Sequence, residues 1–197
     1  MKKLVIATRN EGKAAEFRRL LAELPFETLF LTDFPEVPEI EECGCSFTEN
    51  ALIKAKTVVS LTGELALADD SGLEVEALSG RPGLYSARFS GPGSTDEANN
   101  RKLLHELEGV PAEQRTASFR AAIAIAGPGI TSQVVEGVCE GSITLAPQGE
   151  GGFGYDPLFY VPEAGKTFAE MEPAEKNAFS HRARAFAAAL EILQQLS

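Results

Sequence analysis

The N-terminal part of the chain alternates short apolar runs with stretches of helical periodicity, and this alternation constrains the fold more than any other feature. Residues 3–7 are Lys-Leu-Val-Ile-Ala, a run that predicts a buried first strand. The segment after it predicts a helix that ends at Pro25. The apolar positions of that helix are Phe17, Leu20, Leu21 and Leu24. Strands and helices in alternation are typical of α/β proteins.

Further helices are predicted from capping signals and spacing. Ser46–Glu49 and Ser94–Glu97 both have the form of a capping box, so a helix is expected to begin at each. The first helix is expected to end at Gly63 and the second to run to about Glu108. Residues 180–196 predict a C-terminal helix.

Further strands are predicted at 26–31, 65–68 and 158–161. Two longer runs, 116–126 and 132–139, flank Gly127-Pro128-Gly129 and predict a long hairpin. The order of elements therefore predicts an α/β protein with a mixed β-sheet, flanked by helices, that carries this hairpin.

Length and composition narrow the class of protein. A chain of 197 residues fits one domain, residues 1–197. With 18 basic and 29 acidic residues the net charge is −11, which disfavours binding to nucleic acid or to an anionic membrane. The three cysteines form no Cys-x-x-Cys pair, so a reducing compartment is expected. No apolar run is long enough for a signal peptide or a membrane span, so we expect a cytoplasmic protein.

The turn after the first strand, Thr8–Lys13, is the first candidate site. A polar strand-to-helix turn offers free backbone N–H groups and Lys13 adds a positive charge, a combination that suits a phosphate. It is not a Walker P-loop, because Ala14 follows the lysine. The alternative is that Asn10 is only a helix cap.

Acidic residues supply the second candidate. Asp69-Asp70-Ser71-Gly72 follows a predicted buried strand, and two adjacent carboxylates need a cation or turn donors to offset their repulsion. Neighbouring strand side chains point in opposite directions, so one aspartate is expected to face the site. A plain turn is the alternative. Glu41, Glu42 and Lys54 are ordinary surface residues unless the face that bears Lys54 turns inward.

Two candidates lie in the C-terminal part. Gly149-x-Gly151-x-x-Gly154 leads into a strand rather than a helix, so it is not a dinucleotide fingerprint. The loop instead suits a flat ligand, with Phe153 or Tyr155 stacking on it. Lys176 and Ser180-His181-Arg182 come next, and the position of His181 favours ligand contact, with burial as the alternative.

Together these candidates describe a polyphosphate site with a metal ion in an acidic chain. Glu42 and Asp70 supply carboxylates, which suit Mg²⁺ better than zinc. The cations of the site are Lys13, Lys54, Lys176 and Arg182. We expect them to converge in one cleft.

Six segments, in order along nearly the whole chain, resemble the inosine triphosphate pyrophosphatase family, most closely its bacterial members. They are Thr8-x-Asn10-x-Gly12-Lys13, Glu42-x-Gly44-x-Ser46-Phe47-x-Glu49-Asn50-Ala51, Ala68-Asp69-Asp70-Ser71-Gly72, Gly80-x-Pro82-Gly83-x-Tyr85-Ser86-Ala87-Arg88, Gly152-Phe153-Gly154-Tyr155-Asp156-Pro157 and Ser180-His181-Arg182. The resemblance implies an ITPase-like fold, a homodimer, and Mg²⁺-dependent hydrolysis of dITP, ITP and XTP to the monophosphate and pyrophosphate. Arg9 stands where a glycine is frequent in the family.

The resemblance also implies residue roles. Asp70 would be the proton acceptor and a magnesium ligand, and Glu42 would contribute to the metal site. The triphosphate would bind at Thr8, Arg9, Asn10, Glu11, Gly12 and Lys13. The rest of the nucleotide would contact Ser71, Phe153, Gly154, Tyr155, Asp156, Lys176, His181 and Arg182.

The expected reaction is attack of water on the α-phosphorus, with Asp70 taking the proton and lysines stabilising the departing pyrophosphate. A donor from His181, Arg182 or the backbone near Phe153 is expected to read the 6-oxo group of the base. Two alternatives stay open: a pyrophosphatase for pyrimidine or modified triphosphates, and a nucleotide-binding module without catalysis.

Overall fold

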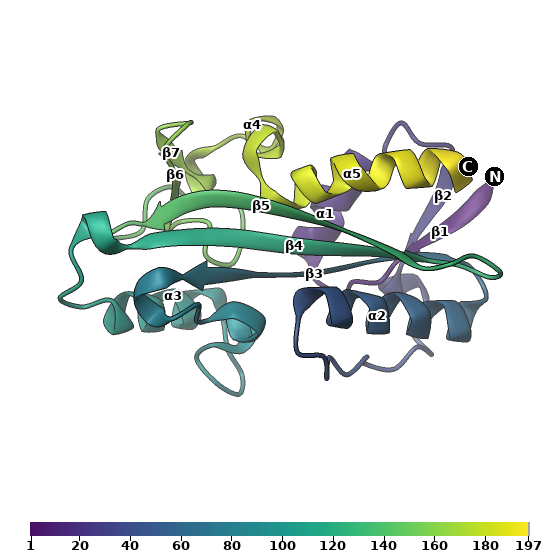
Figure 1. Cartoon of the computed structure of the whole chain (residues 1–197), viewed down its shortest axis with the longest axis horizontal. Coiled ribbons are helices and arrows are strands. Elements are labelled where there is room, and N and C mark those ends of the chain that lie inside the picture. Colours follow the sequence, from purple (N-terminus) through teal and green to yellow (C-terminus); the bar gives the residue numbers. More distant parts are fainter. Residues whose placement is uncertain (197) are drawn as a thin grey trace. The chain divides into compact units, whose positions relative to one another are not determined.

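The structure is a computed structural model, and it describes residues 1–196 (Figure 1). Seven strands form one sheet in the order β2-β1-β3-β4-β5-β6-β7. The strands are β1 (Lys2–Ile6), β2 (Phe26–Phe30), β3 (Leu65–Val75), β4 (Thr116–Ala126), β5 (Gln133–Ile143), β6 (Phe159–Val161) and β7 (Lys166–Thr167). The helices are α1 (Glu11–Leu20), α2 (Phe47–Thr62), α3 (Asp96–Glu106), α4 (Pro173–Phe179) and α5 (His181–Leu196).

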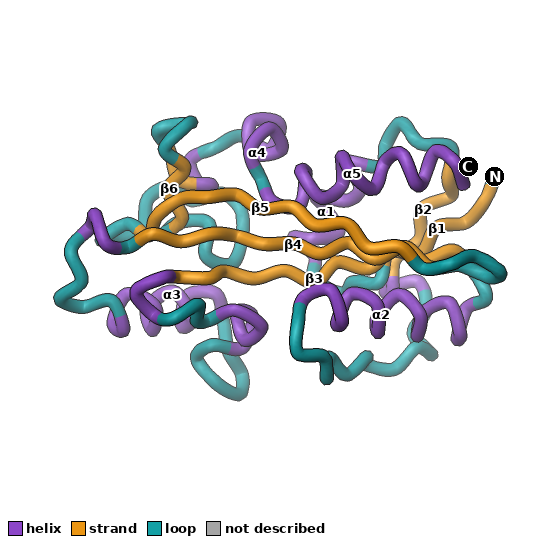
Figure 2. The backbone as a smooth tube through the Cα atoms, viewed as in Figure 1, coloured by secondary structure: helices purple, strands orange, loops and turns teal. Residues whose placement is uncertain are grey.

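The sheet is mixed, as the order of elements predicts. Strand β1 pairs in parallel with β2 and β3, whereas β6 pairs antiparallel with β5 and β7. Strands β4 and β5 are neighbours joined by residues 127–132, which is the predicted hairpin (Figure 2). The α/β prediction with a mixed sheet and a long hairpin is therefore confirmed.

The chain divides into two compact units. Unit 1 contains residues 1–70, residues 121–137 and α5 from Ala183 onward, and unit 2 contains residues 71–120 and 138–182. The long strands β3, β4 and β5 each contribute residues to both units. The prediction of a single domain over residues 1–197 stays a prediction.

Unit 1 has three layers, with α2 on one face of its strands and α1 and α5 on the other (Figure 1). The alternation of side chains along each strand produces this arrangement. In β1, Leu4 and Ile6 join the cluster under α1 and α5, while Val5 and Ala7 join the cluster under α2. Both faces are apolar because both are covered by helices.

Strand β3 is longer than predicted. The sequence predicts its end at Ala68 and a turn at Asp69-Asp70-Ser71-Gly72, but the strand continues to Val75. The plain-turn alternative is therefore wrong. The two carboxylates are tolerated inside the strand because each has a lysine partner, Lys13 for Asp69 and Lys54 for Asp70.

Unit 2 has its own core, rich in aromatic residues. Phe119, Phe159 and Phe168 lie against one another, with ring centroids 4.7 to 5.9 Å apart. Helix α3 packs its Leu103 into this cluster.

One local prediction in unit 2 needs correction, and two short elements were not predicted. The N-cap of α3 is Thr95 and not Ser94, and since Ala98 stands three residues later there is no capping box. Strand β6 is followed by a two-residue strand, β7, that has no distinct pattern in the sequence. Lys176 lies on α4, a seven-residue helix that is too short for a clear periodicity.

Within residues 1–196, every helix is either too short or too polar to cross a membrane.

Candidate active site

The turn after β1 begins the candidate site in unit 1. Helix α1 starts at Glu11, so Gly12 and Lys13 lie in its first turn. Asn10 caps this helix, since its Oδ1 accepts a bond of 2.9 Å from the backbone N–H of Lys13, and Thr8 Oγ1 accepts one of 3.1 Å from the N–H of Asn10. Asn10 is thus a helix cap, and the same turn presents Lys13 at the positive end of α1.

Parallel pairing places this turn beside β3. Ile6 lies opposite Leu67, and the backbone N–H of Ala7 donates to Leu67 O at 2.8 Å. The carboxyl end of β1 therefore meets the aspartates of β3, where ligands bind in open parallel sheets. Lys13 Nζ lies 2.7 Å from Asp69 Oδ2, and the side chain of Asp69 is fully buried.

Arg9, a predicted substrate contact, directs its side chain to protein carbonyls. Its guanidinium donates to Leu31 O at 3.2 Å and to Val37 O at 2.5 Å. These bonds tie the turn to the segment that follows β2.

Helix α2 turns a polar stripe inward. Ser46 Oγ caps it by accepting from the N–H of Glu49 at 3.1 Å, and Glu49 reaches back to the N–H of Cys45 rather than of Ser46. Asn50 and Lys54, one turn apart, are both buried and face β3. The helix face that bears Lys54 therefore turns inward, so Lys54 is not an ordinary surface residue.

The ammonium group of Lys54 joins the acidic residues of unit 1. Its Nζ lies 2.6 Å from Glu42 Oε1, 2.8 Å from the backbone oxygen of Asp69 and 3.2 Å from Asp70 Oδ1. A lysine has three N–H donors, so these contacts use all of them. The predicted residues Glu42, Lys54 and Asp70 are therefore brought together.

Asn50 is a further residue of this group, and the sequence analysis did not select it. Its Nδ2 donates to Asp70 Oδ2 at 3.1 Å, and its Oδ1 accepts from the N–H of Gly44 at 2.8 Å. A Cβ on Gly44 would lie 2.7 Å from Asn50 Oδ1, so only glycine fits there. The four-residue spacing from Asn50 to Lys54 was the signal that could have found it.

Burial and charge shift two pKa values in this group. Burial raises the pKa of the Asp70 carboxyl above its ordinary value, with Lys54 and Lys13 acting in the opposite direction. Burial by itself would lower the pKa of Lys54, but the carboxylates of Asp70 and Glu42 outweigh it and the pKa of Lys54 is raised. Lys54 is therefore charged at neutral pH.

The carboxylates of this group suit a hard cation whose remaining ligands come from the substrate. Residues 1–196 contain no group of three or more His, Cys, Asp or Glu side chains arranged to hold a metal. Glu42 and Asp70 both form an ion pair with Lys54, so their two carboxylates lie around the same ammonium group. Mg²⁺ commonly takes one or two carboxylates with phosphate oxygens and water, and the residues fit that pattern.

The second group of predicted residues lies in unit 2. Arg182 donates to Ser71 Oγ at 2.9 Å, and Lys176 Nζ lies 2.5 Å from Asp156 Oδ2. Both cations also lie near the ring of Phe153, with Lys176 Nζ 4.9 Å and the guanidinium carbon of Arg182 5.8 Å from its centroid. Phe153, which is partly exposed, is the aromatic platform of this group.

The glycine-rich loop is folded around Asp156. Asp156 Oδ2 accepts from the N–H of Phe153 at 3.0 Å, and a Cβ on Gly152 would lie 2.0 Å from the same oxygen. Gly152 also has a positive φ of 73°. This position therefore needs glycine on two counts.

Two predictions for unit 2 are corrected. Tyr155 is only 4% exposed and its hydroxyl donates to Ser86 O at 2.8 Å, so its ring belongs to the core and cannot stack on a ligand. His181 is likewise buried, and its ring stacks on Phe119 with centroids 4.7 Å apart. The prediction that His181 avoids burial is wrong, because the aromatic core of unit 2 covers the start of α5.

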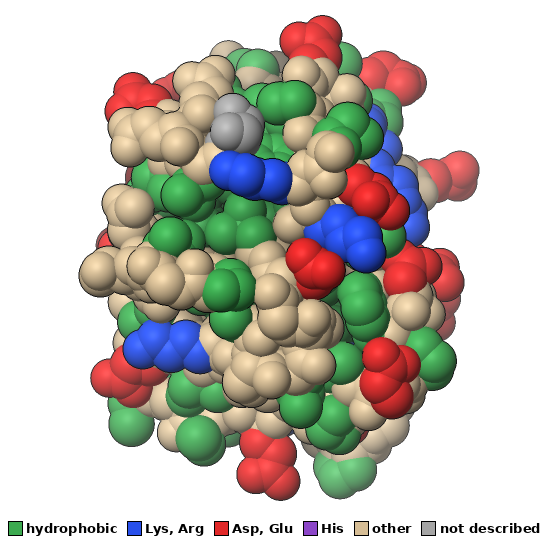
Figure 3. All heavy atoms as spheres, turned by 90° about the vertical axis from the view of Figure 1, so that its right-hand side faces the viewer, with side chains coloured by type: hydrophobic (Ala, Val, Ile, Leu, Met, Phe, Trp, Pro, Cys, Tyr) green, Lys and Arg blue, Asp and Glu red, His purple; other side chains and the backbone are tan. Residues whose placement is uncertain are grey.

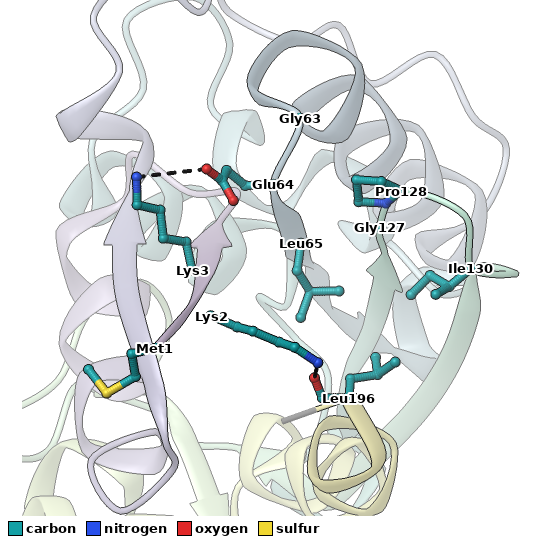
Figure 4. Close-up of a pocket in the computed structure, with 10 residues that line it drawn as sticks. All are labelled: Met1, Lys2, Lys3, Gly63, Glu64, Leu65, Gly127, Pro128, Ile130 and Leu196. Carbon is teal, nitrogen blue, oxygen red and sulfur yellow. Dashed lines mark hydrogen bonds and ion pairs between the residues drawn. The ribbon is translucent and has the colours of Figure 1, made fainter.

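A pocket of about 520 Å³ lies in unit 1 near the amino ends of β1 and β3, and none of the predicted residues lines it (Figure 4). Lys2 and Lys3 point into this region, but Lys2 Nζ donates to Leu196 O at 2.8 Å and Lys3 Nζ lies 3.8 Å from Glu64. On the face in Figure 3, basic side chains are scattered among acidic and apolar ones. No predicted role falls on this pocket.

Comparison with known proteins identifies the family. The Ham1 family model matches residues 4–192. The chain belongs to the Ham1 family. The resemblance inferred from the six segments is thereby confirmed.

The similarity covers nearly the whole chain and more than nine tenths of the relatives named here. The chain is 56% identical to a dITP/XTP pyrophosphatase of Geobacter sulfurreducens, covering 95% of this chain and 94% of the relative. It is 54% identical to a dITP/XTP pyrophosphatase of Geobacillus kaustophilus, covering 94% and 91%. A solved Ham1 protein of Coxiella burnetii superposes with a TM-score of 0.89 at 43% identity, covering 99% of this chain and 100% of that one. The ITPase-like fold is therefore confirmed.

Proposed function

We propose that this chain is a nucleoside-triphosphate pyrophosphatase that hydrolyses dITP, ITP and XTP to the monophosphate and pyrophosphate. Such a hydrolase removes non-standard purine nucleotides from the nucleotide pool. The observation that carries the assignment is the group in unit 1 where Lys13 and Lys54 meet Asp69, Asp70 and Glu42. Names of full-length relatives at more than half identity support the substrate class.

The unit 1 group handles the triphosphate. The N–H groups at the start of α1 and the charge of Lys13 stabilise phosphate oxygens. Thr8, Arg9, Asn10, Glu11, Gly12 and Lys13 form this binding turn. The ammonium of Lys54 adds to the charge that meets the leaving pyrophosphate.

Asp70 accepts the proton of the attacking water. The water oxygen bonds to the α-phosphorus, the bond from that phosphorus to the bridging oxygen breaks, and pyrophosphate leaves. Asn50 orients the carboxylate by donating from Nδ2 to Asp70 Oδ2 at 3.1 Å. A carboxyl whose pKa is raised by burial is a better base than an ordinary aspartate.

Mg²⁺ is the proposed cofactor, with Glu42 and Asp70 as its protein ligands. When bound, it neutralises charge on the phosphate oxygens and polarises the α-phosphoryl group. The two carboxylates that share Lys54 support this proposal.

The unit 2 group recognises the nucleoside. Phe153 supplies a flat apolar face for the base, and the guanidinium of Arg182, which lies near that ring, is the proposed donor for the 6-oxo group. Ser71, Lys176 and Asp156 hold these groups in place through the bonds described above. His181 and Tyr155 support the group from the core.

One assay tests the function. Pyrophosphate release is measured for ITP, dITP, XTP, ATP, GTP and a pyrimidine triphosphate, each with and without Mg²⁺. We expect release from the first three only, and only with the metal. Release from the pyrimidine substrate alone would favour the related pyrophosphatase, and no release with retained ITP binding would favour a silent binding module.

Further parts of the proposal concern the molecule in the cell. We propose a cytoplasmic homodimer that binds neither nucleic acid nor membranes. Within residues 1–196 the three cysteines are thiols rather than disulfides, which supports a reducing compartment, and the net charge of −11 disfavours polyanions. Sedimentation velocity tests the dimer, and electrophoretic mobility of a labelled duplex tests nucleic-acid binding.

A further inference from the structure

We propose that Lys54 is an internal competitor of the metal ion: its ammonium holds Glu42 and Asp70 together, and a divalent cation must displace it to bind both carboxylates. This inference rests on the proposed function, which makes Glu42 and Asp70 the metal ligands. It concerns the order in which metal, lysine and phosphate interact.

Geometry supports the competition. Lys54 Nζ contacts Glu42 Oε1 at 2.6 Å and Asp70 Oδ1 at 3.2 Å, so the ammonium lies between the two carboxylates. A third bond, to the backbone oxygen of Asp69 at 2.8 Å, uses its last donor. The lysine therefore has no donor left for a phosphate while it keeps these contacts.

Because the site is buried, the ammonium of Lys54 and a divalent cation exclude each other from the carboxylates of Glu42 and Asp70. The Lys54 side chain is 10% exposed and that of Asp70 is 9% exposed, so solvent screens their interaction weakly. Adding a divalent cation beside a buried ammonium brings three positive charges together. Withdrawal of the ammonium from the carboxylates removes this repulsion.

The exchange links metal binding to substrate binding. Once Lys54 leaves Glu42 and Asp70, the two donors that these carboxylates occupied are available to an anionic ligand. A metal without substrate gains the carboxylates but must separate a buried ion pair, which costs free energy. A metal with a triphosphate offers the released ammonium a new anionic partner. The protein alone therefore binds metal weakly, and binding of metal and triphosphate is cooperative.

Direct titration of the metal tests the inference. Chelator-treated full-length protein without nucleotide is titrated with Mn²⁺, and the free ion is followed by electron paramagnetic resonance. In Lys54→Met we expect the Kd for Mn²⁺ to fall about tenfold or more relative to the unmodified protein. Lys13→Met is the matched control, because it also removes one positive charge but contacts Asp69 rather than Glu42; a smaller change is expected there.

A second measurement uses the unmodified chain and so does not depend on folding of the variant. The amine of Lys54 is labelled with an acylating reagent and quantified by mass spectrometry with and without Mn²⁺. We expect labelling of Lys54 to rise with the metal while labelling of Lys102, in unit 2, stays constant.

The outcomes separate this inference from the proposed function. Equal Mn²⁺ affinity in the unmodified protein and Lys54→Met, or constant labelling of Lys54 at saturating metal, overturns the competition even if ITP is hydrolysed. Absence of pyrophosphate release overturns the proposed function, while the Mn²⁺ titration still reports on the lysine.

Discussion

The proposed proton transfer depends on the carboxylate of Asp70, which Asn50 and Lys54 contact from two sides. In Asp70→Asn the shape of the side chain is kept, but the oxygen that accepts the proton loses its basicity. We expect a stably folded protein whose turnover of ITP falls by about 100-fold or more. Pyrophosphate release at saturating ITP and Mg²⁺, with circular dichroism as the folding check, measures this.

Asp33→Asn serves as the control for that substitution. Asp33 is an exposed residue whose Oδ2 accepts from the N–H of Phe30, and an amide oxygen can replace it. Turnover should be unchanged. Full activity in Asp70→Asn would remove Asp70 from the reaction.

Tyr155 gives a prediction for alkaline pH. Burial raises the pKa of its phenol above the ordinary value. The unfolded chain therefore ionises first, near pH 10, so the stability from this group is complete below about pH 10 and falls as pH rises further. Denaturant titrations from pH 8 to 11 should show this loss, and Tyr155→Phe should reduce it.

The same substitution also removes the bond to Ser86 O, so we expect Tyr155→Phe to lose about 1–3 kcal/mol near neutral pH. Tyr85→Phe, at a ring that is 61% exposed, should leave stability within about 0.5 kcal/mol. A pH dependence that is the same in Tyr155→Phe and the unmodified protein would contradict the assignment to Tyr155.

At the scale of single elements, the N-cap of α2 stabilises the helix that carries two residues of the unit 1 group. Ser46 Oγ accepts from the N–H of Glu49 at 3.1 Å, and the helix carries Asn50 and Lys54 one turn later. Ser46→Ala should cost about 1 kcal/mol of unfolding free energy in urea titrations. Ser60→Ala, at an exposed position of the same helix, is the control and should cost less than about 0.5 kcal/mol. Equal costs would show that Ser46 does not stabilise the helix.

Elements could be predicted from local pattern where one signal dominates. Ser46 and Gly63 mark the ends of α2, and both ends are found as predicted. The end of β3 could not be predicted, because Asp69 and Asp70 look like turn residues until their partners on α1 and α2 are known. Local sequence does not encode a pairing between distant residues.

The candidate site shows the same limit. Glu42, Lys54 and Asp70 were selected by residue type, and the structure brings them together. Asn50 was missed because an amide in a helix suggests no chemistry by itself, and its four-residue spacing from Lys54 was the one signal that marks it. The burial of His181 depends on Phe119, which is distant in sequence, so neighbouring residues alone could not reveal it.

For the molecule as a whole, the net negative charge repels the anionic substrate. The net charge is −11, and the unit 1 group itself has two lysines against three carboxylates. A triphosphate therefore approaches a negative protein, and salt should screen the repulsion. At constant free Mg²⁺ we expect kcat/KM for ITP to rise about twofold between low and physiological ionic strength. A steep fall over that range would mean that a local positive field controls encounter.

The bond from Lys2 Nζ to Leu196 O, 2.8 Å long, shows that the two ends of the described chain lie side by side within unit 1 (Figure 1). Ends that are neighbours can be joined by a short linker without displacing a strand. We therefore expect a circular permutant, with Lys2 and Leu196 joined by a short linker and new ends in the connection between β4 and β5, to fold. Fusion partners attached at either terminus will likewise emerge from the same corner, far along β1 and β3 from the aspartates.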